Sequence, residues 1–132
     1  MSFALLFLRS AAPYTGRINF WRNDMNQLPA PIAAYVEAAN AHDPARVAAC
    51  FQPDATVRDE GRSHHGCEAI AAWAAETGTR YAPTITPDAI AHADGLYRLQ
   101  AEVSGNFPGS PASLAFRFAL GADGIVSLEI GA

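Results

Sequence analysis

The sequence predicts one α+β domain in which helices come first along the chain and antiparallel strands follow. Apolar residues recur at helical spacing between residues 28 and 77, and they alternate with polar residues in the segments after residue 82. The chain has 132 residues with 50% hydrophobic content, which is enough for one hydrophobic core. Helices followed by a run of strands are typical of α+β rather than α/β folds.

Two helices are predicted before the first strand. The first begins near residue 28, and its apolar face consists of Leu28, Ile32, Tyr35, Val36 and Ala39. Residues 40–43 end this helix, with His42 at its carboxyl-terminal cap. Asp43 then suits the N-cap of a second, short helix because Pro44 follows at its first position. The apolar face predicted for that helix is Val47, Cys50 and Phe51.

The segment ATVRDEGRSHHG, residues 55–66, gathers two acids, two arginines and two histidines. Its first half predicts a short strand with Val57 and Asp59 on one side. The second half is interpreted as a polar turn from strand to helix, with Ser63 as the helix cap. The third helix is then predicted to end at Gly78, and its buried stripe is Cys67, Ile70, Trp73, Ala74 and Thr77.

Strand-like segments with turn residues between them fill the rest of the chain. Tyr97, Leu99, Ala101 and Val103 alternate with polar residues, as on a half-buried antiparallel strand. The turns are predicted at residues 94–95, 105–111 and 122–124. Phe107 is expected at the tip of the second turn, where it covers either a pocket mouth or a subunit interface.

Residues 1–25 are interpreted as an N-terminal extension of uncertain structure, and residues 26–132 as the domain. The apolar run FALLFL, residues 3–8, has no basic residue before it and is shorter than the core of a signal peptide. It is also far too short to span a membrane. Cys50 and Cys67 are expected to be free and buried, which fits a reducing cytoplasm.

The charge pattern argues against nucleic acid as a partner. The net charge is −4, and all nine basic residues are arginine, a usage typical of a GC-rich bacterial genome. Residues 26–132 carry six arginines against twelve acids, without a basic stripe. His64 and His65 are adjacent on a turn and lack a third ligand at helix or hairpin spacing, so no metal site is predicted.

Three segments together resemble the nuclear transport factor 2-like superfamily. They are AYVEAANAHDPARVAACFQPDATVRDEG at residues 34–61, GCEAIAAW at 66–73 and FRFALGADGIVSLEI at 116–130. This superfamily includes ketosteroid isomerases and SnoaL-like polyketide cyclases. The resemblance implies three N-terminal helices packed on a strongly curved, mostly antiparallel sheet that encloses a conical cavity. It also implies a homodimer.

The resemblance assigns roles to individual residues. Tyr35 matches the oxyanion donor of ketosteroid isomerases, and Asp59, 24 positions later, matches their general base. The position of their second oxyanion donor is occupied by Leu114. The implied activity is a cofactor-independent isomerase or cyclase acting on a small apolar carbonyl compound. Loss of one oxyanion donor typically costs about 10²–10³ in rate, so the match also fits a weaker or different chemistry.

Alternative interpretations of the same residues remain open. A Tyr on a helix face and an Asp at a strand end also fit a non-catalytic binding or dimerisation module. A dehydratase would instead pair Asp59 with His64 or His65, one of which is expected to fold back toward the acids. The candidate ligand-binding side chains are His64, His65, Trp73, Tyr97, Phe107, Phe116 and Phe118, of which the five aromatic residues fit a plain core equally well.

Overall fold

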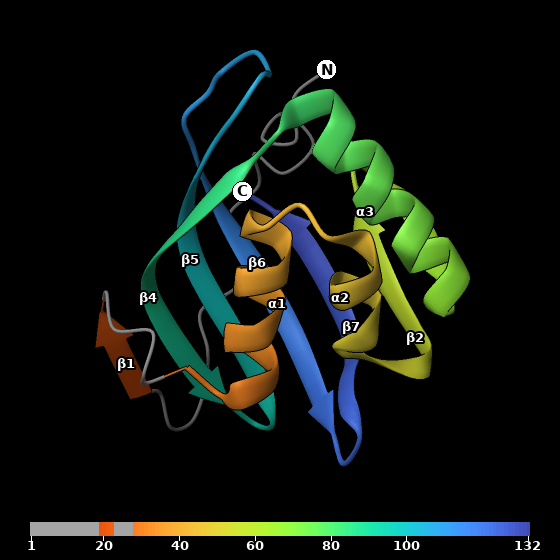
Figure 1. Ribbon diagram of the computed structural model, residues 1–132. Helices are drawn as coiled ribbons and strands as arrows, with labels where there is room; N and C mark the ends of the chain where they lie inside the picture. The colour runs from red at the N-terminus through yellow and green to blue at the C-terminus, as the bar shows by residue number, and fades with distance from the viewer. Residues whose placement is uncertain (1–18, 23–27) are drawn as a thin grey trace.

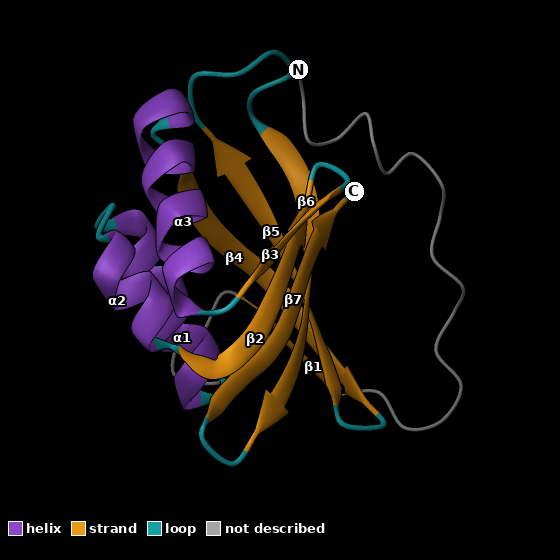
Figure 2. Cartoon of the chain, turned by 90° about the vertical axis from the view of Figure 1, so that its right-hand side faces the viewer, coloured by secondary structure: helices purple, strands orange, loops and turns teal. Residues whose placement is uncertain are grey.

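The computed structural model describes residues 19–22 and 28–132 and confirms the α+β class. In chain order the elements are β1 (Asn19–Arg22), α1 (Ala30–Asn40), α2 (Pro44–Ala49), β2 (Phe51–Asp59), β3 (Arg62–His65), α3 (Cys67–Tyr81), β4 (Thr84–Ala93), β5 (Leu96–Ser104), β6 (Ala112–Gly121) and β7 (Gly124–Gly131). Figures 1 and 2 show the three helices together on one face of the sheet.

The sheet has seven strands in the order β1-β4-β5-β6-β7-β2-β3. Its neighbouring strands are antiparallel except for β2 and β7, which are parallel, so the predicted mostly antiparallel sheet is confirmed. The register shifts within the β2–β7, β4–β5 and β6–β7 pairs. Such bulges bend strands and increase their twist, which lets the sheet curve around the helices.

The two predicted N-terminal helices are present. The Pro29 carbonyl accepts the first hydrogen bonds of α1, from the backbone amides of Ile32 and Ala33. Asp43 caps α2 as predicted, and its Oδ1 accepts a hydrogen bond from the Arg46 amide at 3.2 Å. Phe51, however, is the first residue of β2 rather than part of the α2 face.

The polar segment after Asp59 is a β-hairpin, so the prediction of a strand-to-helix turn capped by Ser63 is wrong. Glu60 and Gly61 have φ values of 56° and 76°, which is the left-handed pair that a tight two-residue hairpin turn requires. The chain therefore reverses at once, and β3 pairs antiparallel with β2. The helix that follows has Gly66 at its N-cap and makes no side-chain cap bond.

The third helix is longer than predicted, because Gly78 does not end it. It continues to Tyr81 and ends where Ala82 adopts a left-handed φ of 44°. A Cβ placed on Gly78 would lie 4.0 Å from the Cβ of His42, so this glycine lies where α3 passes close to the α1–α2 turn. Cys67 is exposed, contrary to the predicted buried stripe, because it is the first residue of the helix.

The four predicted C-terminal strands are confirmed, with Asp94 and Gly95 in left-handed conformations at the β4–β5 turn. Their inner face supplies much of the core, including Leu99, Leu114 and Phe118, each at most 1% exposed. Phe107 is not at an exposed loop tip as predicted. It is buried, and its ring contacts Tyr81 edge-on with centroids 6.0 Å apart.

Part of the N-terminal extension contributes to the sheet. Residues 19–22 form β1, which pairs antiparallel with residues 89–92 of β4. The sequence gives no reason to place a strand there, because the segment is short and does not alternate. The apolar run at residues 3–8 lies outside the described residues.

Candidate functional site

Asp59 lies at the end of β2 with its side chain turned toward the helices. It is 4% exposed and is the only buried charged residue among residues 28–132. The predicted face is thus confirmed: Val57 is buried on the same side, whereas Arg58 is exposed on the other. The Trp73 indole N–H donates to Asp59 Oδ2 at 3.1 Å, and Oδ1 has no hydrogen-bond partner.

Burial changes the acidity of Asp59. Loss of water raises the pKa of its carboxyl group from 3.8 to about 7, although the Trp73 hydrogen bond opposes the rise. The negative charge of Glu60 raises this pKa further, and the backbone amide of Glu60 lowers it. A carboxyl group with a pKa near 7 takes up and releases protons readily at neutral pH, as a general base must.

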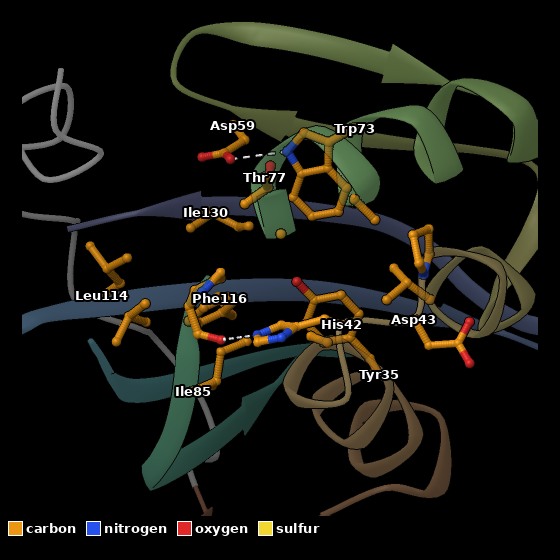
Figure 3. A pocket seen from close by; sticks show the side chains of 17 residues that line it. Tyr35, His42, Asp43, Asp59, Trp73, Thr77, Ile85, Leu114, Phe116 and Ile130 are labelled. Atoms are coloured by element: carbon orange, nitrogen blue, oxygen red, sulfur yellow. Dashed lines mark hydrogen bonds between the residues drawn. The ribbon is translucent and has the colours of Figure 1, made fainter. Parts of the chain in front are cut away.

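Tyr35 reaches the same region from α1. It is 3% exposed, and its ring contacts Phe51 and Phe118 edge-on, with centroids 6.1 Å and 5.6 Å apart. Burial first, and then the nearby Asp59 charge, raise the pKa of its hydroxyl far above the usual value of 10. The hydroxyl therefore stays protonated and acts as a hydrogen-bond donor. Figure 3 shows it pointing into a cavity bounded on another side by Asp59 and Trp73.

The cavity between helices and sheet encloses about 50 Å³. Its wall includes Tyr35 from α1, Trp73 and Thr77 from α3, and Leu114 and Phe116 from β6 (Figure 3). A water molecule needs about 10–15 Å³ measured in this way, so the cavity has room for about four waters. The exposed His42 also belongs to the wall, so the cavity reaches solvent at the α1–α2 turn.

A second, polar cleft of about 30 Å³ lies on the other side of Asp59. It shares Asp59, Trp73 and Thr77 with the cavity, and its remaining wall is Glu60, Arg62, His64, Glu76, Arg80 and Tyr81. Burial and the neighbouring Arg62 lower the pKa of His64, which therefore favours the neutral form. Asp59 thus borders both an apolar and a charged space.

Three of the seven predicted binding residues line these two spaces. Trp73 and Phe116 line the cavity, and His64 lines the polar cleft with its ring 6.1 Å from the Trp73 ring. His64 does not bond to Asp59. The prediction that one histidine folds back onto Asp59 or Glu60 is therefore not met within the described residues.

The other four predicted binding residues lie elsewhere. His65 is on the opposite face of the hairpin, where its Nδ1 is 2.9 Å from the Thr56 hydroxyl oxygen. Tyr97 is stacked on His92 with ring centroids 4.2 Å apart, at the β4–β5 end of the sheet. Phe107 and Phe118 are core residues outside the cavity wall. Strand alternation explains the His65 error, because a one-residue shift in register moves a side chain to the other face.

Thr77, His42 and Asp43 line the cavity without having been predicted as site residues. Thr77 lies on the predicted buried stripe of the third helix. This stripe was the feature of the sequence that could have identified it as a site residue. For His42 and Asp43 the sequence predicted helix-capping roles at the ends of α1 and α2, and the structure contains both. His42 adopts φ 54° after α1, and its Nε2 lies 2.9 Å from the Pro83 carbonyl oxygen.

Within residues 19–22 and 28–132 no three His, Cys, Asp or Glu side chains are grouped so that they could hold a metal ion. The same part of the chain contains no helix that is long and apolar enough to cross a membrane. Leu114, at the position of the absent second donor, is fully buried in the cavity wall.

The fold places the chain in the class of cone-shaped α+β proteins. Its helices pack on one face of a curved sheet, and a buried acid faces a small cavity between them. The family model of the SnoaL-like domain matches residues 32–125, and the chain belongs to this family. No curated protein sequence matches the chain.

Solved structures of other proteins share this fold. A candidate polyketide cyclase from Sinorhizobium meliloti is 32% identical, with a TM-score of 0.78 over 81% of this chain and 98% of its own. A ketosteroid isomerase-like protein from Catenulispora acidiphila, in complex with trimethylamine, is 22% identical with a TM-score of 0.69, covering 77% of this chain and 84% of its own. A cystatin-fold protein from Novosphingobium aromaticivorans is 16% identical with a TM-score of 0.64, covering 76% and 94%.

Proposed function

We propose that the protein is a cofactor-independent isomerase or cyclase in which Asp59 is the general base and Tyr35 the oxyanion donor. The observation that carries the proposal is their position in one cavity: a buried carboxylate and a buried phenol bound the same 50 Å³ space. Proton abstraction beside a carbonyl group needs a base near the C–H bond and a donor at the carbonyl oxygen.

The proposed reaction uses these two groups in sequence. Asp59 accepts a proton from the carbon next to the carbonyl group, and the electron pair of the broken C–H bond moves to the carbonyl oxygen. The Tyr35 hydroxyl donates a hydrogen bond to the resulting enolate oxygen. In an isomerisation the protonated Asp59 returns its proton to another carbon of the same molecule. In a ring closure the enolate carbon attacks a second carbonyl group, the π electrons of that group move to its oxygen, and the resulting alkoxide takes the proton from Asp59.

The size of the cavity limits the ligand. Pockets for drug-sized ligands enclose about 300–1,000 Å³, several times the volume here. Only a compound of a few non-hydrogen atoms fits without side-chain movement, although part of a larger one extends past His42 into solvent. The apolar wall of Leu114, Phe116 and Ile85 favours an uncharged group. The substrate class is therefore a small apolar carbonyl compound.

Phenol binding tests the proposal, because an ionised one-ring phenol resembles an enolate in shape and charge. Titration of the purified protein with 4-nitrophenol above pH 8, where this ligand is ionised, followed by a change in chemical shifts or heat, gives a dissociation constant. The Tyr35→Phe variant should bind at least tenfold more weakly, since a hydrogen bond to a charged oxygen contributes about 1.5–3 kcal/mol. Asp59→Asn should bind equally or more tightly, because it removes a negative charge from beside the bound anion.

Tyr97→Phe is the matched control, since it removes a tyrosine hydroxyl far from the cavity wall. Its affinity should equal that of the unmodified protein. Binding that is indifferent to both Tyr35→Phe and Asp59→Asn would overturn the assignment of a shared site.

The second candidate is a non-catalytic binding module of the same fold, and Leu114 favours it because a second oxyanion donor is absent there. The two candidates differ in one measurement. A catalytic Asp59 exchanges the α-hydrogens of small ketones for deuterium in D₂O, and Asp59→Asn abolishes this exchange. A binding module takes up the ketone and leaves those hydrogens in place.

We also propose that the chain forms a homodimer through the face of the sheet opposite the helices. Arg98, Arg117, Glu129 and Arg58 lie in one row across β5, β6, β7 and β2 of that face. None of the four has an ion-pair partner in the described part of the chain, where Arg46 and Glu37 form the one such pair. Mixed charges on one face complement the same face of a second copy turned by a two-fold axis.

Cys50 and Cys67 are unpaired, which fits a reducing cytoplasm.

A further inference from the structure

Among the described residues, Trp73 is the one side chain that donates a hydrogen bond to the Asp59 carboxylate. Its indole N–H approaches Oδ2 at 3.1 Å, while Oδ1 is buried and has no hydrogen-bond partner. The two oxygens of one carboxylate therefore have different surroundings. Figure 3 shows Oδ2 facing the indole and the second oxygen turned away from it.

The indole is itself held in place. Trp73 is 8% exposed in the middle of α3, and its ring packs beside His64 of β3. The hydrogen bond links α3 to the end of β2 between residues 14 positions apart. A flexible donor such as Lys would lose more rotamer freedom in holding this oxygen than the rigid indole does.

We propose that Trp73 is a positioning residue that anchors Oδ2 of Asp59 and leaves Oδ1 as the oxygen that accepts the substrate proton. This inference rests on the proposed role of Asp59 as a base. The anchor has two effects. It fixes the direction from which the carboxylate meets the C–H bond, and it favours the ionised form of an acid that burial would otherwise keep protonated.

A purely structural role of Trp73 would be to fill space and satisfy its own N–H group. That role and the positioning role differ in what happens to the titration of Asp59. If the indole stabilises the carboxylate, its removal raises the pH at which Asp59 ionises. If the indole merely fills space, a ring of similar shape without the N–H leaves that pH unchanged.

The decisive variant is Trp73→Phe, studied with ¹³C-labelled aspartate so that the carboxyl resonance of Asp59 can be followed against pH. The Asp59→Asn spectrum identifies that resonance. The midpoint of the Asp59 titration should rise by about one pH unit in Trp73→Phe, because one hydrogen bond to the charged carboxylate is lost. An unchanged midpoint in a folded variant would overturn the proposal.

A second measurement needs no change at Trp73. The chain has two tryptophans, Trp21 and Trp73, so the Trp21→Phe spectrum assigns the Trp73 indole N–H resonance. This resonance should move with pH at the same midpoint as the Asp59 carboxyl group, and it should not move in Asp59→Asn. A Trp73 resonance that is independent of pH in the unmodified protein would contradict the anchor.

Both measurements are made without a ligand, so they separate this inference from the proposed function. If the midpoint of the Asp59 titration is unchanged in Trp73→Phe and phenol binding depends on Tyr35 and Asp59, only the proposed role of Trp73 is overturned. If that midpoint is raised and phenol binding is indifferent to Tyr35 and Asp59, the hydrogen-bonding role of Trp73 is supported and the catalytic role of Asp59 is overturned. At saturating ketone, Trp73→Phe should slow deuterium exchange at pH 7 more than at pH 9, where the carboxyl group is ionised in both proteins.

Discussion

A carboxyl group with a pKa near 7 inside the protein makes the stability of the fold depend on pH. The pKa of Asp59 is 3.8 in water and about 7 in the folded chain, so between these pH values only the folded state keeps the proton. The contribution of the neutral acid is complete below about pH 4 and is lost as pH rises to about 7. At about 1.4 kcal/mol per pH unit, the loss amounts to at most about 4 kcal/mol.

Asp59→Asn should therefore stabilise the protein at pH 8 and have little effect at pH 4. The amide is neutral at every pH and still accepts the Trp73 hydrogen bond. Urea unfolding of both proteins at pH 4, 6 and 8 gives the free energies of unfolding, and the difference should grow with pH. Asp54→Asn, on an exposed part of the same strand, serves as the control. A difference that is constant from pH 4 to pH 8 would mean that Asp59 titrates normally.

The site residues differ in how far the sequence identified them. Asp59 and Tyr35 were predicted because each lies on an apolar face and because their spacing matches a known family. The orientation of Asp59 followed from strand alternation next to Val57. Its partner Trp73 was predicted on the buried stripe of the third helix and as a candidate ligand contact, but not as a partner of Asp59. A hydrogen bond between residues of different elements depends on packing that no local pattern encodes.

At the level of elements, Gly78 separates the sequence prediction from the structure. The sequence suggested a helix end, where glycine would adopt a left-handed φ that alanine resists. The structure has Gly78 inside α3, with a helical backbone and open contact distance to His42. Tyr81, four residues after Thr77, continues the buried face into the last turn of α3. The glycine was taken as the end of the helix, so this last turn was missed.

Gly78→Ala should stabilise the protein by about 0.5–1 kcal/mol, because alanine loses less backbone freedom in a helix interior. The added methyl group would make an ordinary contact with His42. Thermal unfolding measured by circular dichroism reports the change. Ala75→Gly, an exposed position on the same helix, should destabilise by a similar amount. A loss of stability in Gly78→Ala would instead favour a left-handed glycine at the end of a shorter helix.

The hairpin between β2 and β3 was missed for a related reason. Hairpin turns are most readily identified when Asn or Asp precedes Gly, and here Glu60 adopts the left-handed conformation. Four polar residues then form β3, in which apolar and polar residues do not alternate. The tertiary pairing with β2 decides the conformation of this segment rather than its own propensity.

For the whole molecule, the order of helices and strands followed from periodicity alone, whereas the order of the strands within the sheet did not. The helical and strand patterns predicted the five elements after residue 66, which are α3, β4, β5, β6 and β7, as separate segments. The resemblance supplied their arrangement. The pairing of β1 with β4 was not foreseen, because residues 19–22 carry no pattern of their own.

The proposed homodimer makes a prediction about the outer face of the sheet. Arg117 lies between Arg98 and Glu129, so Arg117→Glu reverses the charge at the centre of that row. We expect the unmodified protein to sediment as a dimer at micromolar concentration and Arg117→Glu to sediment as a monomer with unchanged circular dichroism. Asp123→Arg, a reversal in the exposed β6–β7 turn, should remain dimeric. A monomeric unmodified protein would contradict the proposal.

The parallel pairing of β2 with β7 has a consequence for how the protein is made. Thr56, Val57 and Arg58 pair with Ser127, Leu128 and Glu129, about 70 positions later in the chain. The strand that carries Asp59 therefore finds its partner on that side only after β7 has been synthesised. Contacts of such long sequence separation slow folding. The enclosure of the acid thus waits for β7, and a nascent chain that stops before Gly124 has helices and hairpins but no completed chamber.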